Sequence, residues 1–451
     1  MARTLLHNAR IITGDNDFTG YLVIDGDRIA EIGESDPTEE LKATCETVED
    51  LGGKWLLPGV IDDQVHFRDP GLTHKGDIET ESRAAVAGGV TSFMDMPNTK
   101  PQTVTLEAWQ DKMRRASDVS HANYAFFFGA TNDNASEIDR LDPKQIPGLK
   151  VFLGSSTGNM LVDKEEALER IFALPWLIAV HSEDEQIIRA NADGFRERYG
   201  ENVPVSAHPL IPMRSSRACY ECTRRAIERA KRLGTRLHLL HLSTAEEAKR
   251  LGNEPLPGRK ITGEVCVHHL WFTDIDYDRL GAKIKWNPAV KRATDRDELR
   301  CAIADGRIQI VATDHAPHLP EEKVGGALQA ASGGPGVEYS LLVMLELALQ
   351  GIVSLPQVVQ LMCQNPAVLF GIEKRGFIRP GYKADLVVVN PKIATLAGEH
   401  VYSKCGWTPY EGVRFSHSID TTYVNGRVAF RSGEFPERAA EPLRFNQSDR
   451  R

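Results

Sequence analysis

The chain has 451 residues, of which 41% are hydrophobic and 26% are charged, as expected of a globular protein with a sizeable buried core. Its net charge of -9, with no basic block, argues against nucleic acid as a partner. No apolar run approaches the ~20 residues of a membrane span, and the N-terminus has no signal-peptide layout. We therefore expect a cytoplasmic protein with no membrane partner.

Segments with strand character lie at both ends of the chain. The first ~55 residues alternate apolar and polar side chains, with Gly and Asp at hairpin spacing, and similar segments return near the C-terminus. This pattern predicts a small β-sandwich built from residues 1–56 and 371–440, beside a central domain of residues 57–370. Residues 441–451 form a polar tail that we expect to be frayed.

The central section alternates short apolar runs with helical patterns, which is typical of parallel β/α units. Eight strands over about 260 residues predict a (β/α)8 barrel, a fold of ~250 residues. A doubly wound sheet is the alternative, but it would carry a Gly-rich phosphate loop after the first strand, and the sequence has none. The eight runs are "GVIDDQVHF", "GVTSFMDMP", "ANYAFFFGA", "GLKVFLG", "WLIAVHSE", "RLHLLHLS", "ITGEVCVHH" and "IQIVATDHAP".

Polar, mostly ionisable residues stand at the ends of these runs, and in a barrel the chemistry lies at the carboxyl ends of the strands. Buried groups of this kind need partners. A single one of them can be a core histidine with satisfied hydrogen bonds, whereas a whole set favours convergence on a metal. The set is His66, Asn98, Lys150, His181, His241, His268, His269 and Asp314.

The cysteines give no metal site of their own. Seven are scattered along the chain, and this odd number argues for reduced thiols. Cys219 and Cys222 form one C-x-x-C, but a zinc ribbon needs a second pair. The surrounding stretch "SSRACYECTRRAIERAKRLG" predicts a helix on which the two thiols share a face.

Eight motifs occur in a fixed order: "PGVIDDQVHFRDPG", "DMPNTKP", "GLKVFLG", "HSEDE", "HLST", "EVCVHHL", "NPAVK" and "TDHAPH". Each alone is weak, but the ordered set resembles the amidohydrolase superfamily, and within it the dihydroorotases of the long bacterial type. The resemblance runs from about Leu57 to Gly412. It implies a homodimeric hydrolase of cyclic amides that interconverts dihydroorotate and N-carbamoyl-aspartate in pyrimidine synthesis.

The resemblance also implies a centre of two zinc ions. His66 and Asp314 would bind the first ion, and His181 and His241 the second. Lys150 would be carbamylated by carbon dioxide and bridge both, because a carbamate is anionic whereas an ammonium is repelled by cations. A hydroxide between the ions would attack the ring carbonyl, and Asp314 would carry the proton to the leaving nitrogen.

A carboxylate-binding group is expected beside this centre. Arg68 follows His66 by two residues and shares its strand face, where a guanidinium can grip a carboxylate. The resemblance assigns this grip to Arg68, Asn98 and His318, with Asn287 contacting the ring. A carboxylate-bearing ring favours dihydroorotate. Allantoinase- or hydantoinase-type activity is the alternative.

Structural roles compete with functional ones at two positions. Arg68 could instead form a salt bridge with Asp69 or Asp77. His238 precedes His241 by three residues on one predicted strand, so we expect it on the opposite face as a packing residue.

The D-x-H-x-H motif of the family is altered in "DDQVHF", where Gln64 replaces the first histidine. An amide oxygen is a poor zinc ligand, but His66, the carbamate, Asp314 and hydroxide would still give the first ion four ligands, which zinc accepts. We therefore favour a working enzyme with a weakened first site. The alternative is a catalytically impaired homologue that acts as a scaffold. Residues 64 and 66 are expected on the same strand face.

Overall fold

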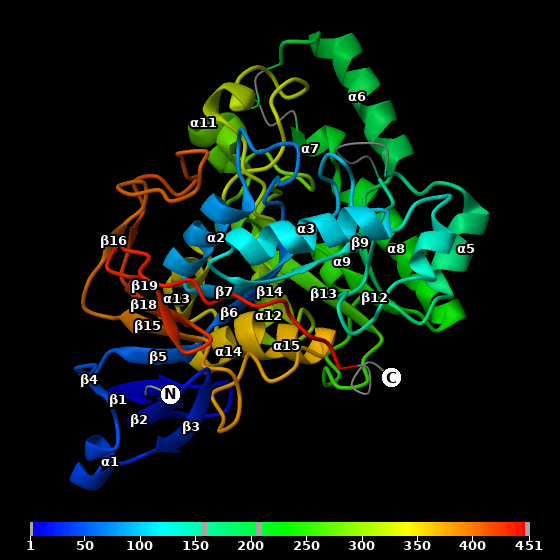
Figure 1. The fold of residues 1–451 in the computed structure, drawn as a ribbon. Coiled ribbons are helices and arrows are strands. Elements are labelled where there is room, and N and C mark those ends of the chain that lie inside the picture. Colours follow the sequence, from blue (N-terminus) through cyan, green and yellow to red (C-terminus); the bar gives the residue numbers. More distant parts are fainter. Residues whose placement is uncertain (1–2, 155–159, 204, 206–209, 447–451) are drawn as a thin grey trace.

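The structure, a computed structural model, describes residues 3–154, 160–203, 205 and 210–446 (Figure 1). Its centre is the predicted barrel, and all eight predicted strands are confirmed. The third of them is divided into two short strands. The barrel strands are β6 (Val60–Val65), β7 (Val90–Asp95), β8 (Asn123–Phe126) with β9 (Phe128–Gly129), β10 (Leu149–Phe152), β11 (Leu177–His181), β12 (Arg236–Leu239), β13 (Ile261–Cys266) and β14 (Ile310–Ala312).

The strands pair in parallel in chain order, as β6-β7-β8 and then from β9 to β14. A bridge between Val65 and His315 joins the last strand to the first. Next to it, the backbone N–H of His66 donates to the carbonyl oxygen of His315 at 2.7 Å. Closure of the barrel therefore fixes His66, which follows β6, against the loop that follows β14.

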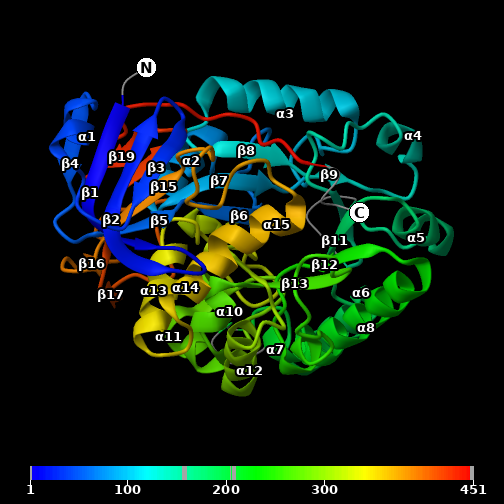
Figure 2. The ribbon, with the colours of Figure 1, turned by 90° about the horizontal axis from the view of Figure 1, so that it is seen from below.

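Helices surround the barrel (Figures 1 and 2). The stretch with the C-x-x-C motif is one of them, as predicted, and Cys219 and Cys222 are both buried on it. The outward faces of the strands pack against the helices in one large apolar cluster. The main helices are α2 (Ile78–Ala87), α3 (Leu106–Val119), α5 (Glu165–Phe172), α6 (Glu185–Tyr199), α8 (Ser216–Leu233), α9 (Ala245–Ala248), α12 (Ala293–Ala304), α13 (Ser340–Leu349) and α15 (Asn365–Phe370).

Both ends of the chain contribute strands to one eight-stranded sheet beside the barrel (Figures 1 and 2). The N-terminal and C-terminal halves of the sheet join where β5 (Trp55–Pro58) pairs with β15 (Leu386–Asn390) in antiparallel orientation. The predicted fold class, a barrel with a β-sandwich domain from both termini, is thus confirmed, while the residue limits of the domains stay a prediction. The strands are β1 (Arg3–Ile12), β2 (Asp17–Asp25), β3 (Arg28–Gly33), β4 (Thr47–Asp50), β5 (Trp55–Pro58), β15 (Leu386–Asn390), β18 (Ser418–Val424) and β19 (Arg427–Arg431).

The C-terminal segment differs from the prediction. After β19 the chain runs back along the barrel, and Leu443 and Phe445 are buried there. The backbone N–H of Leu443 donates to the carbonyl oxygen of Tyr124 at 2.8 Å, and that of Phe445 to Lys144 at 3.0 Å. The expectation of a frayed tail is therefore wrong for residues 441–446, because two apolar side chains anchor a polar stretch; residues 447–451 lie outside the described part.

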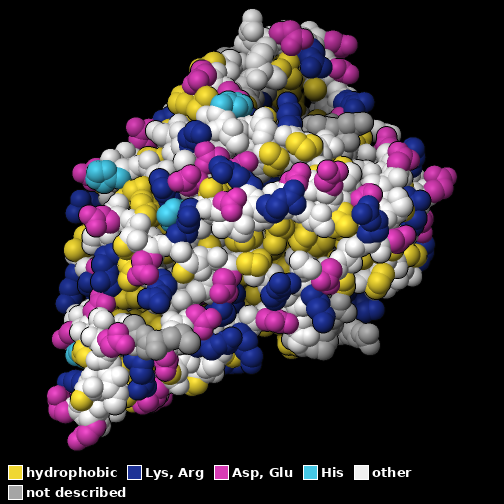
Figure 3. All heavy atoms as spheres, viewed as in Figure 1, with side chains coloured by type: hydrophobic (Ala, Val, Ile, Leu, Met, Phe, Trp, Pro, Cys, Tyr) yellow, Lys and Arg dark blue, Asp and Glu magenta, His cyan; other side chains and the backbone are white. Residues whose placement is uncertain are grey.

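On the face shown in Figure 3, acidic and basic side chains are interspersed. Within the described ranges, no helix is long and apolar enough to cross a membrane.

Candidate metal centre and substrate cavity

One cavity of about 380 Å³ collects all the residues to which a metal- or substrate-binding role was assigned, whereas His268 and His269, also found at a strand end, do not line it. It lies at the carboxyl ends of the barrel strands, where the chemistry of such barrels is found. Several lining residues had no signal in the sequence, above all Arg214, Phe152 and Trp286. The predicted residues in the lining are Gln64, His66, Arg68, Asn98, Lys150, His181, His241, Asn287, Asp314 and His318.

The side of the cavity formed by β6 centres on Asp314. His66 Nε2 lies 3.0 Å from Asp314 Oδ1, and Gln64 Nε2 donates to the same oxygen at 3.3 Å. The side chains of residues 64 and 66 thus point to the same side, as predicted, although His66 lies just beyond the end of β6. The other ring nitrogen of His66, Nδ1, lies 2.7 Å from Asn98 Oδ1, so Asn98 orients the imidazole.

Lys150 lies at the bottom of the cavity with 1% of its surface exposed. Its Nζ is 4.7 Å from the centre of the Phe152 ring, and no carboxylate of the described residues pairs with it. Burial lowers the pKa of Lys150 to about 7. A fraction of its amine is therefore neutral near pH 7, which is the form that reacts with carbon dioxide.

The opposite side holds two imidazoles. His181 Nδ1 and His241 Nε2 are 2.9 Å apart, and burial lowers the pKa of both side chains. Behind them, Arg214 pairs with the fully buried Glu183. Burial would raise the pKa of Glu183, but Arg214 and His181 outweigh it and lower the value to about 2. Neutral imidazoles beside a fixed carboxylate form a suitable ligand pair for a metal ion.

The donor set as a whole fits divalent metal ions. Imidazole and carboxylate are zinc ligands, and Lys150 would add an anionic oxygen as a carbamate. Gln64 Oε1 is buried and accepts no hydrogen bond from the described residues. His66, Lys150 and Asp314 would hold one ion, and Lys150, His181 and His241 the other.

Three of the lining residues have backbone conformations that L-residues rarely adopt. The φ angles are 68° at Arg68, 39° at His241 and 46° at Asp314. Each such residue costs of order 1–3 kcal/mol and persists only where its surroundings impose it. Strain at three positions of one cavity is typical of a functional site.

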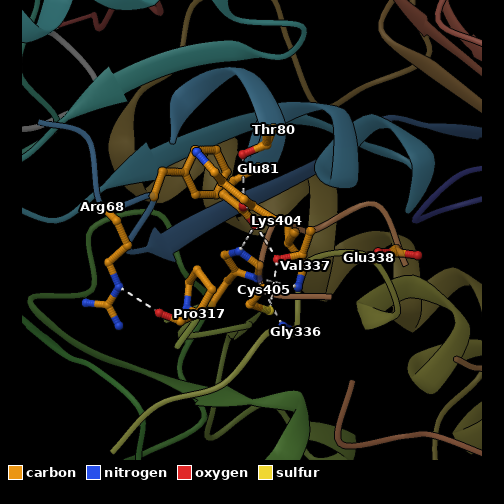
Figure 4. Close-up of polar contacts among 12 residues, drawn as sticks. Arg68, Thr80, Glu81, Pro317, Gly336, Val337, Glu338, Lys404 and Cys405 are labelled. Carbon is orange, nitrogen blue, oxygen red and sulfur yellow. Dashed lines mark hydrogen bonds and ion pairs between the residues drawn. The ribbon is translucent and has the colours of Figure 1, made fainter. Parts of the chain in front are cut away.

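Arg68 does not form the salt bridges that a structural role predicts. Asp69 pairs with Arg115 at 3.2 Å, and Asp77 with Lys404 at 2.8 Å. The Arg68 guanidinium instead donates from Nε to the Pro317 carbonyl oxygen at 3.1 Å (Figure 4). With 4% of its surface exposed, Arg68 is a nearly buried cation aimed at the cavity.

His318 lies between two cations. Its Nε2 is 3.1 Å from a terminal nitrogen of Arg68, and its Nδ1 is 3.1 Å from Lys75 Nζ. Burial, followed by these two neighbours, lowers the pKa of His318 to about 2. The ring is therefore neutral. Glu322 Oε2 lies 3.3 Å from Nδ1 and the other oxygen of Glu322 pairs with Lys75 at 2.9 Å, so Nδ1 donates to Glu322 and Nε2 accepts from Arg68.

The loop that carries Asp314 is held through His315 by Glu81, which is labelled in Figure 4. Glu81 Oε2 lies 2.8 Å from His315 Nε2, and the other ring nitrogen of His315 accepts from the Gly336 N–H at 3.0 Å. The acceptor role of Nδ1 places the proton on Nε2, which donates to Glu81. His315 is thus a structural residue that fixes Asp314 and, through its carbonyl oxygen, His66.

The prediction for His238 is wrong. Lys150 is in register with Ala179, and Ala179 with His238, so His238 shares the inward face of the barrel with Lys150. Its Nε2 lies 3.4 Å from Asp63 and 3.3 Å from Glu264. Burial lowers the pKa of His238, but these carboxylates outweigh it and raise the value to about 9. His238 therefore belongs to a buried polar cluster.

Comparisons with known proteins agree with the site. The amidohydrolase family profile matches residues 55–429. A dihydroorotase of Halobacterium salinarum is 37% identical over 364 residues, which are 79% of this chain and 82% of the relative. An allantoinase of Deinococcus radiodurans is 30% identical over 444 residues, 96% of each chain. The L-hydantoinase (dihydropyrimidinase) structure from Arthrobacter aurescens has a TM-score of 0.90 at 26% identity and covers 98% of this chain and 100% of its own. The chain therefore belongs to the amidohydrolase family, and within it to the metal-dependent cyclic amidohydrolases.

Proposed function

We propose that this protein is a dihydroorotase, which interconverts dihydroorotate and N-carbamoyl-aspartate. The observation that supports this substrate is Arg68, a nearly buried cation in the same cavity as Asp314, with His318 at 3.1 Å. A buried guanidinium with no carboxylate partner in the described chain favours a ligand that brings a carboxylate. Relatives named dihydroorotase at 37% and 33% identity support the same assignment.

The residues of the cavity have separate roles in substrate binding, proton transfer and metal binding. Arg68, Asn98 and His318 bind the ring carboxylate, and Asn287 contacts the ring. Asp314, oriented by His66 and Gln64, takes a proton from water and delivers it to the leaving ring nitrogen. Zinc ions bound by His66, Lys150, His181, His241 and Asp314 would supply hydroxide near neutral pH and polarise the ring carbonyl.

An allantoinase is the second candidate, because the relative of that name matches 96% of the chain. Ring opening should be measured with dihydroorotate, allantoin, hydantoin and dihydrouracil on zinc-loaded protein. We expect turnover of dihydroorotate, the only one of the four with a carboxylate. Preference for allantoin would replace the proposal, and no turnover of any ring by fully loaded protein would indicate a non-catalytic homologue.

Restoring the family histidine at position 64 should strengthen the first metal site. Gln64 already contacts Asp314, so a Gln64→His imidazole needs no rearrangement of the strand. Loss of a residue that hydrogen-bonds to a metal ligand typically lowers the affinity for the metal about 10–100-fold. An added direct ligand should therefore raise the zinc affinity of the weaker site at least about ten-fold. Zinc titration into stripped protein should show two unequal sites in the wild type and more equal ones in the variant. Unchanged affinities would mean that residue 64 does not reach the metal.

Assembly of the centre should depend on pH through Lys150. Carbamylation needs the neutral amine, and burial lowers the pKa of Lys150 to about 7. Below that value the neutral fraction falls about ten-fold per pH unit, and above it the fraction levels off. Recovery of activity by stripped protein should therefore be much slower at about pH 6 than at about pH 8, with zinc and dissolved carbon dioxide held constant. Equal rates at both values would exclude Lys150 as the titrating group.

A further inference from the structure

Three side chains from different strands converge inside the barrel, beneath the cavity. Asp63 on β6, His238 on β12 and Glu264 on β13 are each fully buried, with 0% exposure. One ligand atom from each lies within 4.8 Å of the others. None of the three lines the cavity, so the cluster forms a separate layer below the candidate catalytic centre.

The distances in this cluster match those around a metal ion. His238 Nε2 is 3.4 Å from Asp63 Oδ2 and 3.3 Å from Glu264 Oε2. Zinc ligands at about 2.0–2.1 Å in a tetrahedron lie about 3.3–3.4 Å from one another. The three ligand atoms lie within 4.8 Å of one another, so an ion could bind between them.

The imidazole is oriented for such a role. His238 Nδ1 lies 2.9 Å from Thr262 Oγ1, and the Thr262 hydroxyl donates to the carbonyl oxygen of Leu237 at 3.4 Å. Thr262 therefore accepts the proton of Nδ1, which leaves the Nε2 nitrogen directed at the two carboxylates. A hydrogen bond on the second ring nitrogen is the usual support of a metal-binding histidine.

Charge balance supports the same conclusion. Neither oxygen of Asp63 accepts a hydrogen bond from the residues that the structure describes. The surroundings in the barrel interior are apolar and include Ile61, Leu177 and Phe370. Two ionised carboxylates beside an imidazolium would leave one buried negative charge, which is costly in such surroundings. Burial and the neighbouring Asp63 raise the pKa of Glu264 well above its usual range, so the metal-free cluster holds a further proton. A divalent cation beside a neutral imidazole would replace both protons and leave the cluster uncharged.

We propose that Asp63, His238 and Glu264 bind a divalent cation of the zinc class, at a buried site distinct from the catalytic centre. The ion ties β6, β12 and β13 together. By fixing Glu264, the ion also helps to position His241 in the cavity, since the other oxygen of Glu264, Oε1, accepts the backbone N–H of His241 at 3.0 Å. That hydrogen bond holds His241 at its strained φ of 39°.

Crystals of the zinc-loaded full-length protein provide the direct test. Anomalous scattering at the zinc edge should give a peak between the three side chains, in addition to peaks in the cavity. Crystals with the cavity peaks but no peak in the cluster would overturn the proposal. The cluster would then be an imidazolium between two carboxyl groups that hold the further proton.

Metal counting on variants gives an independent test. The Asp63→Asn variant keeps the size of the side chain and should lose about one zinc per chain. Glu247→Gln is the matched control, because Glu247 is also a buried carboxylate and its partners Thr223 and Thr244 lie outside both the cluster and the cavity. It should keep the wild-type zinc content. An unchanged content in folded Asp63→Asn protein would contradict the proposal, and if that variant does not fold, the wild-type crystals decide. Neither test measures ring opening, so both are independent of the substrate assignment.

Discussion

Replacing Lys150 by alanine is expected to abolish ring opening and to prevent the two metal ions from being bridged. Lys150 is the only lysine among the described residues that line the cavity, which also holds the imidazoles of His181 and His241 and the carboxylate of Asp314. Metal ions supply several kcal/mol of transition-state stabilisation, and their loss corresponds to about three orders of magnitude in rate or more. Steady-state kinetics would measure the loss of ring opening, and the zinc content per chain would measure the loss of metal binding.

A second variant at the same position separates the lost amine from lost packing. Lys150→Ala leaves space in the cavity floor, so a short carboxylic acid added to the solution should replace the carbamate and restore part of the activity. Lys150→Met fills that space with an apolar chain and should resist the same rescue. Full activity of Lys150→Ala without added acid would refute the carbamate, and equal rescue of both variants would show that the acid acts elsewhere.

The barrel could be predicted because each strand is a short apolar run that ends in a polar residue, and parallel strands bring those ends to one edge. The same rule gathered residues as distant in sequence as His66 and His318 into one cavity. Arg214 could not be found in this way. It lies beyond the short helix α7 (Leu210–Met213), not at the end of a strand, and its place in the cavity depends on its partner Glu183.

His238 shows where counting along a strand fails. The prediction assumed that His238 and His241 lie on one regular strand, so that a spacing of three puts them on opposite faces. In the structure β12 ends at Leu239, and the positive φ of His241 turns its side chain into the cavity. Side chains alternate between the two faces within a strand, but this alternation does not continue past the end of the strand. The C-terminal segment shows a related limit. Its composition is polar on average and predicted a frayed tail, but two apolar residues, Leu443 and Phe445, anchor it to the barrel.

Replacing Arg68 by methionine is expected to raise the KM for dihydroorotate far more than that for an uncharged cyclic amide such as dihydrouracil. A charge-assisted contact to a carboxylate in a buried site is worth roughly 2–5 kcal/mol, which corresponds to roughly 30- to 5,000-fold in kcat/KM. Dihydrouracil has no carboxylate and should lose little, so the ratio of the two kcat/KM values measures the contact itself. Arg115→Met is the matched control, because Arg115 pairs with the neighbouring Asp69 outside the cavity and should leave that ratio unchanged. Equal losses on both rings in Arg68→Met would mean that Arg68 holds the Pro317 loop and does not bind the substrate.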